Sequence, residues 1–173
     1  FSCVNVTNPT TPVEEFFISD LNSTWRDIKT WGNYAYVTTE ANAGLLIVDL
    51  TDMAGNTYSH VTQFTNNNGG SVSFTSSHNI YIDENGIVYI FGSGGSGPQS
   101  NGAIFLDADA NPTNPVYLGE WDDYYIHDGM ARGDTMYAGC IYEGKMFVVD
   151  VSNKSNPQTL GSATTPNSFT HNA

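Results

Sequence analysis

Four pairs of adjacent polar residues carry most of the side chains that could bind a metal ion or move a proton. They are Arg26-Asp27, His78-Asn79, His127-Asp128 and His171-Asn172. Neutral imidazole nitrogens suit Zn²⁺ or a similar borderline ion, whereas carboxylate and amide oxygens suit Ca²⁺. His78, His127 and His171 therefore predict a zinc-type site if they converge. Asp27 and Asp128, together with the asparagines of the other pairs, predict a calcium-type site if the oxygens converge instead.

The pairs open successive copies of one sequence unit, and they lie 52, 49 and 44 residues apart (26 to 78, 78 to 127 and 127 to 171). A turn and an aromatic-rich strand follow each of the first three pairs, predicted at Tyr34–Thr39, Ile87–Phe91 and Met136–Ile141. After a second turn comes an apolar run that ends in aspartate, as in LLIVD to Asp49, AIFLD to Asp107 and FVVD to Asp150. Four short strands in each ~40–50 residues are typical of β-propeller blades.

We therefore predict an all-β chain, a single β-propeller region of about three and a half four-stranded blades. Residues 25–76, 77–125 and 126–168 are one blade each, residues 1–24 are the end of a blade, and residues 169–173 start the next one. Propellers usually have four to eight blades, and the sequence starts inside a strand-like segment. We therefore expect the chain to be an excerpt of a larger ring, with open blade edges that favour self-assembly.

The composition narrows the classes of partner. There are 18 acidic and 5 basic residues, a net charge of −13, and only 13% of residues are charged. This acidic balance argues against nucleic-acid binding, which needs a basic surface, and against an anionic membrane surface. There is no apolar run near the ~18 residues needed to span a bilayer. The polar Asn, Thr, Ser and Gly content is typical of an extracellular β-rich protein.

Two further motifs predict structure rather than chemistry. Cys3 and Cys140 fall in separate units, so we predict buried free thiols. The segment GSGGSG (92–97) matches a dinucleotide-binding pattern, but that site needs a helix after the glycines and a strand follows here. We predict a loop between two strands.

At LLIVDL, FVVDV and WRDIKTWGNYAYV the sequence resembles the LVIVD-repeat proteins, and more closely the bacterial and archaeal choice-of-anchor B proteins. Further matching motifs are HNIYID, NPVYLGEW, HDG and VVDVSNKSNP, in order over nearly the whole chain. The resemblance implies a secreted β-propeller that is attached to the cell envelope or released, and it implies no settled enzymatic activity.

Each candidate site has a structural alternative. Buried polar pairs at equivalent blade positions can simply hydrogen-bond neighbouring blades, and we favour this structural role over metal binding. Trp25, Trp31 and Trp121, with Tyr124 and Tyr125, offer a surface on which sugars can stack, but aromatics at such positions usually pack between blades. We predict that these aromatics belong to the core.

Propellers present loops around a rigid ring. We therefore predict an extracellular or cell-surface binding or scaffold module that recognises a protein or glycan, with no catalysis assigned to any residue. One alternative is a metal-dependent enzyme at the channel mouth, using His78, His127 and His171 with Zn²⁺ or Ca²⁺. Another is a structural subunit of an extracellular assembly.

Overall fold

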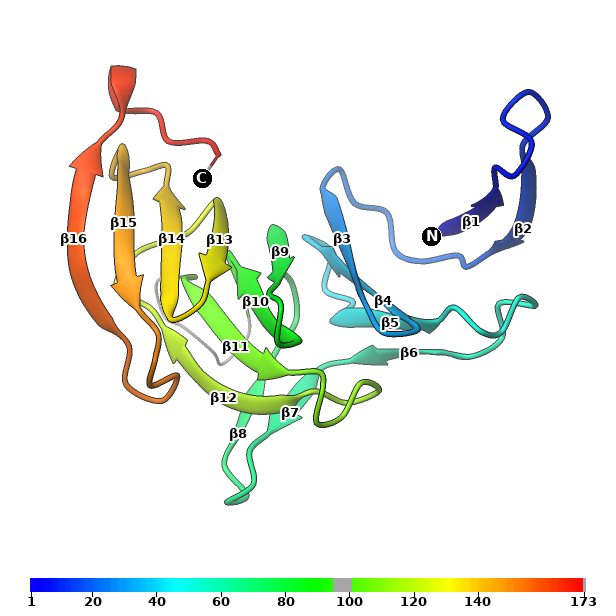
Figure 1. The fold of residues 1–173 in the computed structure, drawn as a ribbon, viewed down its shortest axis with the longest axis horizontal. Coiled ribbons are helices and arrows are strands. Elements are labelled where there is room, and N and C mark those ends of the chain that lie inside the picture. Colours follow the sequence, from blue (N-terminus) through cyan, green and yellow to red (C-terminus); the bar gives the residue numbers. More distant parts are fainter. Residues whose placement is uncertain (95–100, 173) are drawn as a thin grey trace.

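The structure is a computed structural model that describes residues 1–94 and 101–172. Three four-stranded antiparallel sheets stand side by side in an arc, and each is built from one continuous stretch of chain (Figure 1). The first contains β3 (Arg26–Trp31), β4 (Tyr34–Thr39), β5 (Leu45–Asp49) and β6 (Tyr58–Val61). The second contains β9 (Asn79–Ile82), β10 (Ile87–Phe91), β11 (Ala103–Asp107) and β12 (Val116–Trp121). The third contains β13 (Asp128–Arg132), β14 (Thr135–Cys140), β15 (Lys145–Asp150) and β16 (Gln158–Thr164).

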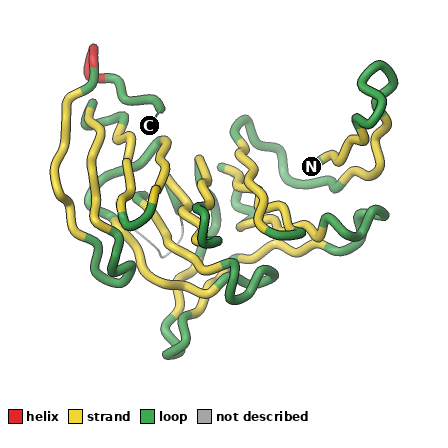
Figure 2. The backbone as a smooth tube through the Cα atoms, viewed as in Figure 1, coloured by secondary structure: helices red, strands yellow, loops and turns green. Residues whose placement is uncertain are grey.

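Two short hairpins complete the described fold. At the N-terminal end, β1 (Ser2–Asn5) pairs with β2 (Val13–Phe17), within the segment predicted to be the end of a blade. Between the first two sheets, β7 (Gln63–Thr65) pairs with β8 (Ser71–Ser73). The described chain is strand and turn almost throughout, apart from the short 3₁₀ turn η1 (Pro166–Ser168) (Figure 2). The all-β, propeller-type prediction is confirmed.

The repeated sequence produces a repeated strand register. Opposite residues pair as Tyr36 with Ile47, Tyr89 with Phe105, and Tyr137 with Val148. The aspartate that closes each apolar run lies opposite the first residue of the aromatic-rich strand, as in Tyr34 with Asp49. Two of those aromatic-rich strands have the predicted bounds. For the third, both predicted bounds were wrong by one residue: the strand is Thr135–Cys140, because Thr135 already pairs with Asp150.

The core lies between neighbouring sheets, as it must when successive side chains point to opposite faces of a strand. One cluster fills the space between the first and second sheets and includes Tyr36, Ile47 and Ile104. Another lies between the second and third sheets and includes Phe105 and Met136. Each fully buried large apolar side chain stabilises the fold by about 1.5–3 kcal/mol. The sheets are therefore held face to face as blades.

Cys3 and Cys140 are both free thiols. Cys140 is fully buried in the cluster between the second and third sheets, and burial, with a smaller contribution from Glu143, raises its pKa to about 12. Cys3 is only partly buried. The prediction of free thiols is confirmed, while the prediction that both are buried was wrong for Cys3, because the hairpin that carries it has a neighbouring sheet on one side only.

Candidate ligand pocket at the rim of the inner strands

The inner strands β3, β9 and β13 lie next to one another, and their first residues meet at one rim (Figure 1). A pocket of about 250 Å³ opens there. All four polar pairs line it, although they come from four successive units of the sequence. The lining residues are Trp25, Arg26, Asp27, His78, Asn79, His127, Asp128, His171 and Asn172. The structure thus brings together every residue proposed above as a metal ligand.

Three imidazole rings form a row along this rim. The ring centroids of His78 and His127 are 4.1 Å apart, and those of His127 and His171 are 4.2 Å apart. The row arises because each histidine stands at the same position of its unit, where an inner strand begins. We name His78, His127 and His171 the histidine row.

Each ring of the histidine row is fixed through its Nδ1 atom. His78 Nδ1 lies 2.7 Å from Glu40 Oε1, and His127 Nδ1 lies 2.9 Å from the carbonyl oxygen of His171. His171 Nδ1 pairs with Oδ1 of Asn172. A carboxylate and a carbonyl oxygen only accept hydrogen bonds, so Nδ1 carries the proton in each neutral ring and the lone pair lies on Nε2.

The pKa of His127 is lowered from its ordinary value. Burial disfavours the charged ring, and the neighbouring His78 and His171 add charge repulsion, which the hydrogen bond to the His171 carbonyl and the Asp128 carboxylate only partly offset. His127 is therefore held neutral at neutral pH. Its neutral imidazole presents a hydrogen-bond acceptor or a metal ligand to the pocket.

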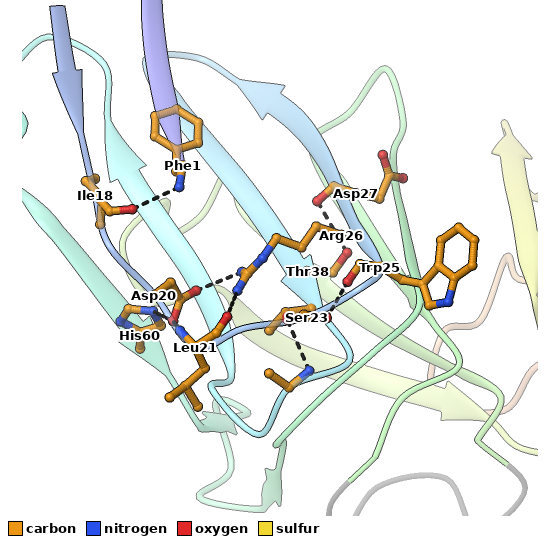
Figure 3. Close-up of polar contacts among 12 residues, drawn as sticks. Phe1, Ile18, Asp20, Leu21, Ser23, Trp25, Arg26, Asp27, Thr38 and His60 are labelled. Carbon is orange, nitrogen blue, oxygen red and sulfur yellow. Dashed lines mark hydrogen bonds and ion pairs between the residues drawn. The ribbon is translucent and has the colours of Figure 1, made fainter. Parts of the chain in front are cut away.

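Arg26 occupies the position of the histidines in its unit, but its side chain is tied back to the preceding segment. Its Nη1 atom donates to Asp20 Oδ2 at 2.8 Å, and its Nη2 atom donates to the carbonyl oxygen of Leu21 (Figure 3). His60 Nε2 lies 3.2 Å from Asp20 Oδ1. Burial opposes ionisation of Asp20, yet hydrogen bonds from Leu21, Arg26 and His60 outweigh it and lower its pKa.

The two aspartates of the pairs are also partly engaged. Asp27 accepts from Lys29 Nζ at 2.8 Å and from the backbone N–H of Ile80, in the next blade, at 3.3 Å. Asp128 accepts from its neighbour Gly129 N–H at 2.8 Å. His78 contacts Glu40 of the preceding blade, whereas His127 contacts the His171 carbonyl of the following unit. The predicted structural role in joining blades is therefore present in the contacts.

Within residues 1–94 and 101–172, no group of three or more His, Cys, Asp or Glu side chains is arranged to hold a metal ion. The three rings of the histidine row follow one another in a line and do not surround a common point, so they do not form such a group. Binding of Zn²⁺ or Ca²⁺ by His78, His127, His171, Asp27 or Asp128 stays a prediction.

The aromatics predicted to be core divide into two groups. Trp121 is buried between the second and third sheets, and Trp31 packs against Gly86 and the first interface. Tyr124 is 37% exposed and Tyr125 is only partly buried, so the core prediction was wrong for Tyr124. Trp25 is 54% exposed and stands at the pocket, with its ring centroid 5.9 Å from that of His78. The prediction that Trp25 belongs to the core was wrong, because it precedes the first residue of β3 and therefore lies beyond the sheet face.

Two residues that shape the rim were not identified from the sequence. Glu40 follows β4 and fixes His78 across the blade boundary, and Asp20 precedes the first complete unit and holds Arg26. Neither recurs at an equivalent place in the other units, so the repeat gave no signal for them. Residues 95–97, the second half of the GSGGSG segment, lie outside the described residues.

Comparison with known protein families gives a match to a repeat family. Two segments, residues 24–56 and 140–165, match the LVIVD repeat. The first segment contains β3, β4 and β5 of the first complete sheet, and the second contains β15 and β16 of the third. LVIVD repeats are of the β-propeller type, in agreement with the fold. No curated protein matches the chain. Among the described residues, no helix is long and apolar enough to cross a membrane.

Proposed function

We propose that this β-propeller module binds a glycan in the rim pocket, at an extracellular or cell-surface location. The observation that carries the proposal is the exposed indole of Trp25 beside a pocket that is otherwise lined by polar side chains from four successive units. Small-ligand sites are concave and combine apolar surface with a few polar groups that fix the ligand's orientation.

The chemistry of the lining suits a neutral, hydroxyl-rich ligand. The face of an exposed indole offers apolar area against the C–H face of a sugar ring. The Asp128 carboxylate accepts hydrogen bonds from hydroxyl groups, and the amide of Asn79 both donates and accepts. Because Arg26 is already paired with Asp20, the pocket has no free strong cation to select an anion.

A protein partner is the less favoured occupant of this site. Specific protein interfaces bury about 800 Å² on each partner and centre on a well-packed apolar core. The rim offers one exposed aromatic among polar groups in a small concavity, which suits a sugar better. The alternative of a metal-dependent enzyme needs three protein ligands and an open position, and the histidine row does not converge in that way.

The location is inferred from composition and resemblance. The low content of charged residues and the similarity to choice-of-anchor B proteins support a secreted module attached to the cell envelope or released. Glycans are abundant ligands in that setting, so the proposed location and the proposed ligand support each other.

The test is a glycan microarray probed with the wild type and with Trp25→Ala. We expect a small set of glycans that bind the wild type and lose at least tenfold in affinity in Trp25→Ala, measured by calorimetry. Tyr142→Ala is the matched control, because Tyr142 is 79% exposed but does not line the pocket. An array without hits, or glycan binding unaffected by Trp25→Ala, would overturn the proposal. A protein ligand lost in Trp25→Ala would replace it with protein recognition.

Assembly is a second candidate function, favoured by the last strand. All seven residues of β16 are exposed, and the strand has no partner on its outer edge among the described residues. An unpaired strand edge is a template for pairing with another chain.

A further inference from the structure

In the histidine row the Nδ1 atoms have hydrogen-bond partners, whereas the Nε2 atoms have none among the described residues. Each Nδ1 atom is already paired with an acceptor: Glu40 Oε1 for His78, a backbone carbonyl for His127, and an amide oxygen for His171. The Nε2 atoms make no hydrogen bond to any described residue, and all three side chains line the pocket. Each Nε2 lone pair is therefore available to a ligand in the pocket.

This is the arrangement that metal-binding histidines show in proteins. A histidine that ligates a metal through one nitrogen almost always donates its other N–H to a carboxylate, a backbone carbonyl or a water, which fixes the tautomer and raises the basicity of the ligating nitrogen. The Glu40 carboxylate, 2.7 Å from His78, and the His171 carbonyl, 2.9 Å from His127, are such partners.

The arrangement of the histidine row allows two of its histidines, and not all three, to bind one metal ion. Two Zn–N bonds of about 2.0–2.1 Å place their nitrogens within about 4 Å of each other. The ring centroids of His78 and His127 are 4.1 Å apart, so the two imidazoles are neighbours on a scale at which ring rotation can bring their Nε2 atoms to one ion. His171 contacts His127, and the described residues include no direct ring contact between His171 and His78. The row thus provides neighbouring pairs of imidazoles and no set of three.

We propose that a borderline divalent transition-metal ion, with Zn²⁺ as its probe, binds the Nε2 atoms of His78 and His127. Water or an oxygen of a bound ligand completes the coordination. Both histidines stand where an inner strand begins, at β9 and β13, so the ion joins two successive blades. The net charge of −13 favours a cation at this rim.

The test is a calorimetric titration of chelator-treated protein with Zn²⁺, in the absence of any glycan. We expect one saturable site whose affinity falls at least tenfold in His78→Ala and in His127→Ala. His60→Ala is the matched control, because it removes the same side chain outside the row, where Nε2 already pairs with Asp20. Equal Zn²⁺ affinity in the wild type and His127→Ala, or no saturable binding, would overturn the proposal.

A second measurement needs no variant. X-ray absorption of the zinc-loaded wild type should show imidazole scattering with Zn–N distances of about 2.0–2.1 Å. A shell without imidazole would also overturn the metal site. The glycan assays repeated with a chelator present separate the two proposals, since the metal site is tested without a sugar and the glycan site without a metal.

Discussion

At the scale of single residues, the rim shows how one repeated position acquires different partners. His78 is held by Glu40, His127 by the His171 carbonyl, and Arg26 by Asp20. Crowding of three imidazoles would be unfavourable if all were charged, because like charges at about 4 Å repel by several kcal/mol in a partly buried site. Such repulsion from its two neighbours is one cause of the lowered pKa of His127.

This leads to a prediction about pH. The pKa of His127 in the folded state lies below the ordinary value of about 6.5. The neutral ring therefore contributes stability that is fully present above pH ~6.5 and is lost as the pH falls from there through the folded-state pKa. We expect the urea midpoint to decrease between pH ~7.5 and ~5.5, and to decrease less in His127→Gln.

The charged or titratable groups that face His127 are His78, His171 and Asp128. Because these groups are unchanged in His127→Gln, the comparison isolates the contribution of His127 to the pH dependence of stability. Carboxylates with lowered pKa values, such as Asp20 and Asp150, lose their contribution at lower pH, as the pH falls through their own folded-state pKa values. An identical pH-dependent loss in wild type and His127→Gln would show that this ring does not titrate as described.

At the scale of elements, each hairpin between the first two strands of a blade turns at a glycine with positive φ. Gly86 has a φ of +78°, and a Cβ placed on it would lie 2.5 Å from the Trp31 ring of the preceding blade. Gly32 occupies the equivalent hairpin of the first blade with a φ of +53° and no atom within 4 Å. Substitutions at these two glycines therefore distinguish the cost of backbone strain in the turn from the cost of disturbed packing between blades.

We predict that Gly86→Ala lowers the free energy of unfolding by about 1–3 kcal/mol more than Gly32→Ala. Both substitutions share the cost of a positive φ, of order 1–3 kcal/mol, but only the first displaces Trp31. Urea unfolding of the two variants measures the difference. Equal losses would mean that Trp31 moves freely and that this contact does not join the blades.

The strands and their order were predictable from the sequence because each element repeats. Tyr34–Thr39 and Ile87–Phe91 have the predicted bounds, since aromatic and β-branched residues alternate between turn signals. The β7–β8 hairpin was not predicted, because it occurs once and lies in the connection that makes the first spacing the longest. Its packing comes from Phe64 and Phe74, which no repeat marked.

In the site, too, the repeated residues were predictable from the sequence and the residues that occur once were not. The histidine row was predictable because His78, His127 and His171 hold equivalent positions, and equivalent positions meet at one rim. The exposure of Trp25 and the roles of Glu40 and Asp20 depend on contacts between segments distant in sequence. A single sequence contains no pattern that reports such contacts.

At the scale of the whole molecule, the third sheet has a face that no other described element covers. Tyr36, Ile47, Tyr89 and Phe105 are buried by the next blade, whereas Val148, which is equivalent to Ile47 and Phe105, is only partly buried. A groove of about 390 Å³ crosses this face. It is lined by Met146, Val148, Leu160, Gly161, Ser162 and Ala163. An apolar blade face of this kind is expected to be covered by another blade or another copy.

We therefore predict that this chain self-associates through the third sheet. Leu160, which is 64% exposed in that groove, should contribute, so Leu160→Asp should shift the average mass toward the monomer in light scattering after size exclusion. Met53→Asp is the control, because Met53 is exposed but lies outside the groove. A monomeric wild type at all concentrations would contradict the prediction.

The central claim is that a glycan binds at Trp25, and the most direct test is the indole N–H signal of that residue. The chain has three tryptophans, so a ¹⁵N-labelled sample gives three such signals, which Trp25→Ala assigns. We predict that a glycan selected on the array shifts the Trp25 signal saturably and leaves that of the buried Trp121 unchanged. Saturable binding that leaves the Trp25 signal unmoved would contradict the account, because the sugar would then lie elsewhere on the ring.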